Sequence, residues 1–261
     1  WKRSLPDESS HCFVYFATVV VSGISYLSYL LKRYVFHESG VLVSGIIGGL
    51  YSSTATISVL ARKSRKASEQ EANEYVAAML LAVSMMFLRF MILILIFSRE
   101  IFTSIYPYLL IMSVVAAVVA WFIHSRHRRS KDMTDESEDE DSSNPLEFKV
   151  ALIFATLFVV FTVLTHYTLV YAGTGGLNLL SFVSGLSDIT PFILNLLQNT
   201  GSVAVLVVVA CSMQAIISNI LVNMFYALFF AGKGSKLRPW ILGGFGTVIG
   251  VNLVLLLFFY L

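Results

Sequence analysis

Residues 41–61 read VLVSGIIGGLYSSTATISVLA, a run that contains no charged side chain. An α-helix needs roughly 20 apolar residues to cross the hydrocarbon core of a bilayer. Lipid offers no partner for an unpaired backbone N–H or C=O group, so a run that crosses must be helical. A transmembrane β-barrel would instead give short segments of alternating hydrophobicity. The run therefore predicts a transmembrane helix.

Similar blocks occupy most of the chain. The 261 residues are 57% hydrophobic and 13% charged, whereas about a quarter of the residues in a soluble domain are charged. We expect an all-α polytopic membrane protein of about eight transmembrane helices, with the lipid bilayer as its surroundings. The predicted spans are 12–31, 41–61, 75–97, 101–123, 148–172, 177–197, 203–231 and 239–260.

A charged linker divides these spans into two sets of four. Residues 126–131 are mostly basic and residues 132–141 mostly acidic, a composition typical of a solvated, disordered connection. The expected domains are a first four-helix half over 1–124, the linker over 125–147, and a second four-helix half over 148–261.

The two halves share a short motif in their second spans. Gly49-Leu50 matches Gly185-Leu186, and Thr54 matches Thr190. The sequence therefore predicts an internal repeat. With four spans in each half, we expect both halves to have one orientation, related by a pseudo-two-fold axis along the membrane normal.

Lys and Arg residues are unevenly divided between the two sides of this eight-span arrangement. Eleven fall on the side of the N-terminus and six on the other. By the positive-inside rule, both termini of the chain are expected to be cytoplasmic.

The second span of each half is expected to break. Pro191 removes a backbone hydrogen-bond donor, and Gly185 loosens the helix just before it. Transporters commonly bind ions or solutes at such breaks near the middle of the membrane. The alternative for residues 41–61 is helix packing, because Gly45, Gly49 and Ser53 lie four residues apart. The polar side chains expected to contact a substrate at the breaks are Ser52, Ser53, Thr54, Thr56, Asp188 and Thr190.

Two charged residues lie well inside predicted spans, Arg89 and Asp188. An ionised side chain at this depth is costly and usually faces a partner or a water-filled cavity. Asn219 and Asn223 lie one helical turn apart and face the same way. We expect these side chains to line one substrate-binding cavity, where Arg89 compensates charge or binds an anionic group. The alternative is a structural pair in which Arg89 neutralises Asp188.

The sequence contains no hydrolase elbow, zinc signature or nucleotide-binding loop. We therefore expect no enzyme activity, no cofactor and no nucleic-acid partner. The two cysteines, Cys12 and Cys211, lie inside apolar blocks and are expected to be small buried side chains rather than metal ligands.

One motif resembles a known family. The run Gly48-Gly49-Leu50-Tyr51-Ser52-Ser53-Thr54-Ala55-Thr56, followed by Leu60-Ala61-Arg62, resembles the signature of an uncharacterised bacterial membrane domain that commonly follows an MgtC/SapB domain. Further similarities are Met86-x-x-Arg89, Asn144-Pro145-Leu146-Glu147, Ser184-Gly185-Leu186-x-Asp188 and Asn219.

The resemblance implies a bacterial inner-membrane protein, and it implies no established activity. Where the family has Asp-x-Asp, the second acid is replaced by Thr190, and its Lys four residues after the Asn is replaced by Asn223. These two departures fit the loss of an ion pair. The chain begins at Trp1 without a signal-peptide pattern, so we expect a fragment or processed product from which N-terminal MgtC-like helices are missing.

The sequence as a whole predicts a secondary transporter or channel-like permease for a small ion or solute, with its site between the two halves. The alternative is a membrane scaffold or regulator that transports nothing and binds another membrane protein. Glycine-rich helix faces leave a homo-oligomer open.

Overall fold

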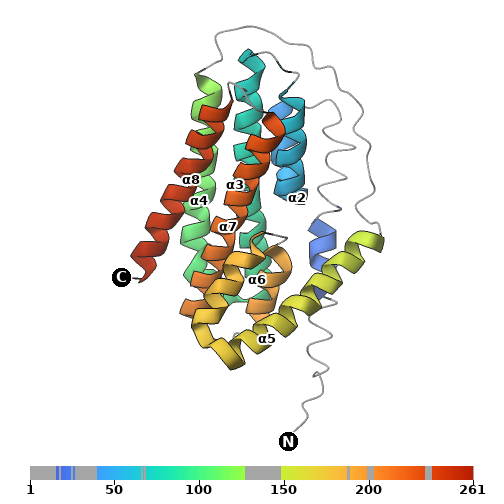
Figure 1. Cartoon of the computed structure of the whole chain (residues 1–261), viewed down its shortest axis with the longest axis vertical. Helices are drawn as coiled ribbons and strands as arrows, with labels where there is room; N and C mark the ends of the chain where they lie inside the picture. The colour runs from blue at the N-terminus through green and yellow to red at the C-terminus, as the bar shows by residue number, and fades with distance from the viewer. Residues whose placement is uncertain are drawn as a thin grey trace, which may run out of the picture.

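The computed structural model describes residues 16–17, 19–24, 26, 40–65, 67, 69–126, 148–186, 189–198, 203–232 and 237–260. The predicted span 12–31 and the linker lie largely outside these residues. Within the described ranges every regular element is a helix (Figure 1). The helices are α2 (Val41–Lys63), α3 (Glu69–Phe97), α4 (Arg99–Ser125), α5 (Phe148–Ser184), α6 (Ile189–Gln198), α7 (Val205–Ala231) and α8 (Arg238–Tyr260).

Five helices of the described part are long and apolar enough to cross a membrane. They are α2, α3, α4, α7 and α8. The expectation of an all-helical protein with several membrane helices is thus confirmed, whereas the number eight is not.

Four long helices, α3, α4, α7 and α8, form the body of the molecule. Ser98 alone connects α3 to α4, and its hydroxyl accepts the Ile101 N–H at 3.4 Å as an N-cap. Because the connection is so short, α3 and α4 run antiparallel, and their centres are joined by a hydrogen bond between the hydroxyls of Ser84 and Ser113 (3.0 Å). A short connection likewise makes α7 and α8 antiparallel.

The end of α7 lies beside the beginning of α3. The Arg65 guanidinium donates to the carbonyl of Phe229 (3.1 Å) and to that of Phe230, and Arg65 precedes α3 by only a few residues. The two helices therefore run in opposite directions, as Figure 1 shows.

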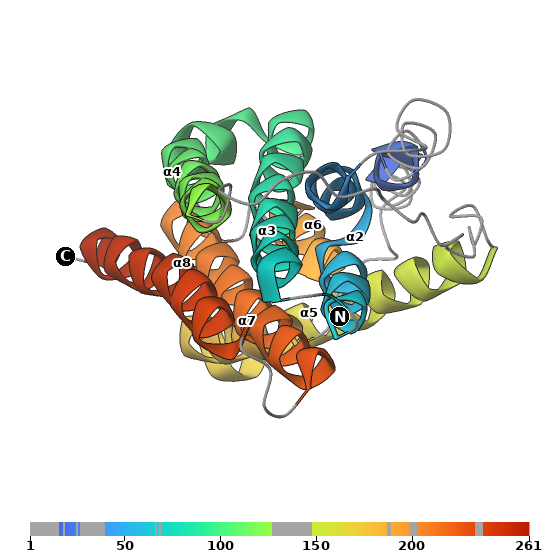
Figure 2. The same cartoon turned by 90° about the horizontal axis from the view of Figure 1, so that it is seen from above.

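The helix α2 folds back on itself at Ser52, the central residue of its 23. The backbone of Ser52 is extended (φ −157°, ψ 107°). Gly48 and Thr56 would lie about 12 Å apart along an unbroken helix. Instead, a methyl group placed on Gly48 would lie 2.5 Å from the Thr56 hydroxyl. Residues 41–51 and 53–63 are thus two arms of a helical hairpin, seen as neighbouring coils in Figure 2; we call it the first hairpin.

The first arm of this hairpin packs closely on α3. Gly45 lies against the backbone of Ala78, and Gly49 against that of Ala82. Both pairs are 33 residues apart, so this arm and α3 run in the same direction. A Cβ atom at either glycine would overlap the α3 backbone. The packing interpretation of the small-residue face is therefore correct for these two glycines.

A second hairpin lies in the other half of the chain. Gly173 breaks α5 with a positive φ of 57°, which glycine adopts readily. The segment after this break, Gly175–Ser184, runs alongside α7. Ser181 donates to Gln214 (2.9 Å) and Cys211 donates to Asn178 (3.3 Å).

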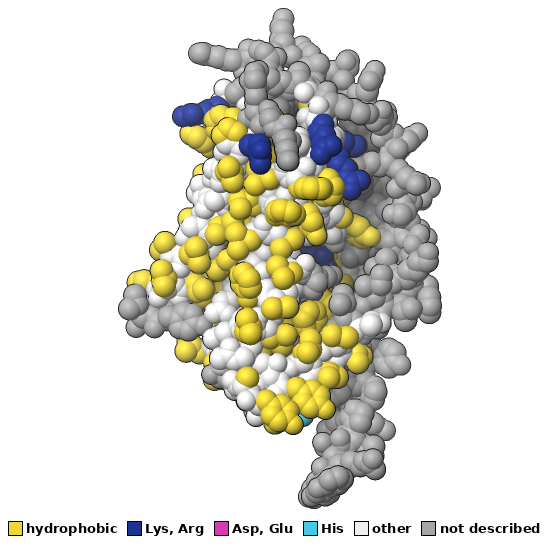
Figure 3. Space-filling model, viewed as in Figure 1, with side chains coloured by type: hydrophobic (Ala, Val, Ile, Leu, Met, Phe, Trp, Pro, Cys, Tyr) yellow, Lys and Arg dark blue, Asp and Glu magenta, His cyan; other side chains and the backbone are white. Residues whose placement is uncertain are grey.

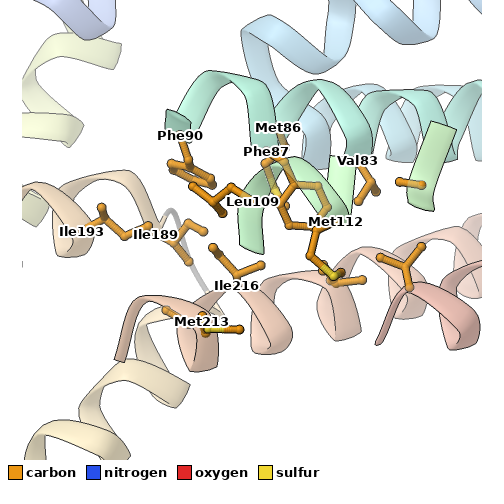
Figure 4. Close-up of a cluster of buried hydrophobic side chains, with 14 of the residues drawn as sticks. Val83, Met86, Phe87, Phe90, Leu109, Met112, Ile189, Ile193, Met213 and Ile216 are labelled. Atoms are coloured by element: carbon orange, nitrogen blue, oxygen red, sulfur yellow. The ribbon is translucent and has the colours of Figure 1, made fainter. Parts of the chain in front are cut away.

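The second arm of that hairpin is α6. The first arm ends at Gly185, which lies against Ser218 near the centre of α7. The helix α6 ends a few residues before α7 begins, so it must run back along α7. Figure 4 shows Ile189 beside Ile216, with Ile193 toward the same end of the molecule as Met213. Gly175–Ser184 and Ile189–Gln198 are thus the two arms of the second hairpin.

These hairpins correct one expectation. The predicted second span of each half was expected to cross once, which would give both halves one orientation. A hairpin instead returns to the side from which it came, so the helices after it run the other way than predicted. The breaks that the sequence predicts in these two spans are confirmed, at Ser52 and after Ser184, where α5 ends.

The surface has an apolar belt and a basic end. In Figure 3, Lys and Arg side chains gather mainly at one end of the visible face, above a surface rich in hydrophobic side chains. Large apolar side chains such as Trp121 and Tyr171 are exposed, as expected for a surface that meets lipid. The core between α3, α4, α6 and α7 is filled by Met, Phe, Leu and Ile side chains (Figure 4).

Candidate functional site

The break in α2 brings a backbone carbonyl within reach of a side chain from α3. In a regular helix the Tyr51 carbonyl would accept the Ala55 N–H. That N–H instead faces the Ser52 hydroxyl at 3.4 Å, as in an N-cap. The Tyr51 carbonyl accepts a hydrogen bond from Nη1 of Arg89 at 2.9 Å. One side chain thus caps each side of the break.

Arg89 reaches this carbonyl from α3 and is half-buried. The carbonyl end of a helix carries partial negative charge, so a cation stabilises it. Arg89 therefore caps the C-terminal end of the first arm of the first hairpin. The sequence does not reveal this role. Whether it also pairs with Asp188 stays open, because Asp188 lies outside the described residues.

The break at Gly185 is capped in a similar way. Nδ2 of Asn219, from α7, donates to the Gly185 carbonyl at 3.3 Å. Nδ2 of Asn223 in turn donates to Oδ1 of Asn219 at 3.2 Å. Both asparagines are buried. The two asparagines that the sequence places on one face of this helix are therefore a hydrogen-bonded chain of amides that starts at the tip of the second hairpin.

The hydroxyl cluster of the first hairpin has several roles. Thr56 closes the hairpin by lying against Gly48. Ser53 is buried, and the Thr54 carbonyl accepts the Ser58 hydroxyl at 2.8 Å. Only Ser52 has a capping role at the tip. Thr190, at the start of α6, is also buried.

The tips of the two hairpins lie at the same height in the molecule. Gly49 lies against Ala82, next to the centre of α3, and Gly185 lies against Ser218, the central residue of α7. The structure therefore brings Arg89 to one tip and Asn219 with Asn223 to the other, both halfway along the long helices.

The sequence did not indicate three residues that hold the hairpins in place, Tyr51, Asn178 and Ser181. Tyr51 contributes only its carbonyl, which no side-chain pattern signals. Asn178 and Ser181 bind α7 through Cys211 and Gln214. The signal that could have found them is spacing, because both pairs are 33 residues apart, like Gly45 with Ala78 and Gly49 with Ala82.

Comparisons with known proteins give a family without an activity. An uncharacterized protein of Aquifex aeolicus (strain VF5) is 27% identical over 221 residues, which cover 84% of this chain and 94% of the relative. No solved structure matches the chain. The model of a family described as a domain of unknown function, DUF4010, matches residues 19–231 and so includes both hairpins. The chain belongs to the DUF4010 family.

Proposed function

We propose that this protein is a secondary transporter or channel-like permease for a small ion or solute, with its site between the tips of the two hairpins. The observation that carries the proposal is the pair of helix breaks at one height, halfway along α3 and α7. Broken helices at the membrane midplane provide backbone and side-chain groups for a substrate. Irregular backbone at that depth persists only inside protein or beside a water-filled cavity.

The lengths of the hairpin arms support this depth. The arms of the first hairpin have 11 residues each, on either side of Ser52, and span about 16 Å. Half of a hydrocarbon core of about 30 Å is 15 Å. Each arm therefore reaches from one membrane face to the middle, and no farther. The second hairpin has arms of similar length, Gly175–Ser184 and Ile189–Gln198.

The two halves form an inverted repeat in this proposal. A shift of 136 residues carries Gly49 to Gly185 and the start of α3, Glu69, to the start of α7, Val205. It also carries two contacts of the first hairpin onto two of the second: Gly45–Ala78 onto Ser181–Gln214, and Gly49–Ala82 onto Gly185–Ser218. Since α3 and α7 run in opposite directions, the two-fold axis lies in the membrane plane.

Inverted repeats provide a physical basis for alternating access. Each hairpin enters from a different membrane face, and its tip reaches the shared site. Rocking one half against the other exposes that site to either side in turn. Two equivalent hairpins can then serve as the two gates of one pathway.

The basic end is proposed to be cytoplasmic. Arg62, Arg65, Arg126 and Arg238 lie at the ends of helices that meet there, and Arg99 lies at the opposite end. The positive-inside rule then favours this orientation. With this orientation the end of α8 falls on the outer side. The expectation of two cytoplasmic termini differs because it counted Lys and Arg over eight crossing spans, which assigned Arg238 to the outside.

The surroundings of the protein stay proposals as well. We propose a bacterial inner-membrane location and a link with MgtC-like helices, both from the family resemblance. A scaffold function is the second candidate, favoured by the tight packing of Gly45 and Gly49 on α3. Such packing needs no substrate.

A flux experiment separates these two functions. The full chain is reconstituted in liposomes, and currents or uptake are followed for cations, anions and amino acids. Asp188→Asn removes the acid that the sequence puts three residues after Gly185, and Glu100→Gln, an exposed acid at the start of α4, serves as the control. If the protein is a transporter, the wild type should show flux, Asp188→Asn should abolish it and Glu100→Gln should retain it. Flux for no solute would favour the scaffold, and equal flux in both variants would keep transport and remove Asp188 from its site.

A further inference from the structure

The chain of amides on α7 has a fixed direction. A backbone carbonyl can only accept a hydrogen bond, so the Gly185 carbonyl requires Nδ2 of Asn219. Oδ1 of Asn219 then points the other way and accepts from Nδ2 of Asn223. The amide orientations of both residues are thereby set, and Oδ1 of Asn223 is left at the end of the chain as an acceptor.

This last oxygen is buried without a partner in the described structure. Asn223 has 0% of its surface exposed, and no hydrogen bond reaches its Oδ1. A buried acceptor without a donor is costly, and each such atom in a native protein needs an explanation. Nδ2 of Asn223 is needed by Asn219, whereas its Oδ1 serves no group of the described structure; the oxygen therefore indicates a ligand that supplies the missing interaction.

The position of Asn223 puts this oxygen between the two hairpins. Asn223 and Phe230 are seven residues apart on α7 and so share one face of the helix. The Phe230 ring contacts the guanidinium of Arg62 at 4.3 Å, at the end of the first hairpin. That face therefore looks toward the second arm of the first hairpin, while Asn219 on the same face holds the tip of the second.

We propose that Oδ1 of Asn223 binds a small monovalent cation, an alkali metal ion or ammonium, as part of the transport site. The proposal rests on the proposed function and names its substrate class. An amide oxygen presents lone pairs, which attract a cation and repel an anion. Neutral oxygens are the ligands of monovalent ions in selective channels, whereas sites for divalent ions are commonly built from carboxylates.

A thermal-unfolding experiment on the purified full chain tests the cation. The protein is kept in choline chloride of constant ionic strength, and sodium, potassium or ammonium chloride replaces the choline. A ligand that binds only the folded state raises the melting temperature; a hundredfold excess over Kd gives a rise of about 5 °C or more. One of the three cations should produce this rise, and replacing chloride by other anions should not.

Two variants locate the effect. Asn223→Leu removes the donor to Oδ1 of Asn219, so it should melt lower than the wild type without the cation, and it should show no rise when the cation is added. Asn252→Leu is the matched control, because Asn252 on α8 is also buried with an Oδ1 that has no partner in the described residues; this variant should keep the rise. Asn223→Asp keeps an oxygen and adds a charge, so it should reach the same rise at a lower cation concentration.

The outcomes separate this proposal from transport. No rise with any cation, or a rise that survives Asn223→Leu, overturns the cation site. A rise that depends on Asn223, in a protein without flux, keeps the site and overturns transport. Flux of an anion that is insensitive to Asn223→Leu keeps transport and overturns the cation.

Discussion

Nη1 of Arg89 donates to the carbonyl of Tyr51 at 2.9 Å, at the point where the first hairpin turns. A charged side chain from α3 thus completes the backbone hydrogen bonding of a helix that ends inside the molecule. The contact joins the two features that single out this part of the sequence, the intramembrane arginine and the hydroxyl-rich break.

Loss of this contact should destabilise the protein. Arg89→Ala leaves the Tyr51 carbonyl without its donor, which costs about 1–3 kcal/mol of unfolding free energy. Arg89→Lys retains a donor and a charge and should recover part of that loss. Unfolding in mild detergent, followed by tryptophan fluorescence, measures both. Arg99→Ala, at an exposed position, should change the free energy by about 0.5 kcal/mol or less. Equal stability of all variants would contradict the capping role.

The close approach of the first hairpin to α3 should not tolerate a methyl group. The Cβ of Gly49→Ala would lie 2.5 Å from the Ala82 Cα, so the helices must separate. Overpacking of this kind costs about 1–3 kcal/mol. Gly246→Ala is the control, because its Cβ meets open space on α8 and alanine favours a helix by up to about 1 kcal/mol. Melting temperatures that fall for the first variant and hold or rise for the second are expected; a reversed order would refute the packing.

Cysteine labelling should reveal the hairpin topology. In a Cys12→Ala, Cys211→Ala background, single cysteines replace Ala67, Ser98, Ala204 and Arg238. An impermeant maleimide applied to one side of the membrane should modify Ala67→Cys together with Arg238→Cys, and from the other side Ser98→Cys together with Ala204→Cys. Eight full spans predict instead that Ala204→Cys is labelled with Ala67→Cys, and Arg238→Cys with Ser98→Cys. These two positions therefore distinguish a hairpin from a crossing helix.

The contact of Arg65 with the end of α7 should hold the second arm of the first hairpin in place. Arg65→Ala removes donors to the carbonyls of Phe229 and Phe230. Because Arg65 is exposed, the loss of overall stability should be small, about 0.3–1 kcal/mol. Hydrogen exchange should nevertheless speed up in residues 53–63 and in the last turn of α7. Arg126→Ala, at the exposed end of α4, is the control and should leave the exchange rates of both segments unchanged. If Arg126→Ala speeds up exchange in these two segments and Arg65→Ala does not, the contact is not what holds the arm.

Much of this fold can be predicted from the lengths of the apolar runs in the sequence. The wrong expectation that residues 41–61 cross the membrane once comes from the same lengths. Residues 41–61 are as long as a crossing helix, and two arms of half that length have the same composition. Hydropathy reports which residues avoid water; it does not report the direction of the chain. The fold-back is encoded by Gly48, which leaves room for Thr56, and by Ser52, which caps the second arm.

The candidate site was predictable in part for a related reason. Intramembrane polarity singled out Arg89, Asn219 and Asn223, and the structure puts each beside a helix break or on the chain of amides that leads from one. The carbonyls that Arg89 and Asn219 cap were not predictable, since every residue has one and only the local backbone geometry frees it. Thr56 belongs to hairpin packing, which residue type alone does not distinguish from substrate contact.

The second hairpin also bears on how such a protein could arise. If it returns to the face it entered, and if residues 148–172 cross as the sequence predicts, the second half crosses the bilayer three times, with 148–172, α7 and α8, and its two ends lie on opposite sides. Two copies of a unit with an odd number of crossings, fused head to tail through a hydrophilic tether, come out upside down relative to each other without any added helix. A single half encoded by its own gene would have had to insert in both orientations and pair with a second copy of itself. The numbers of Lys and Arg on its two membrane sides would then have been nearly equal.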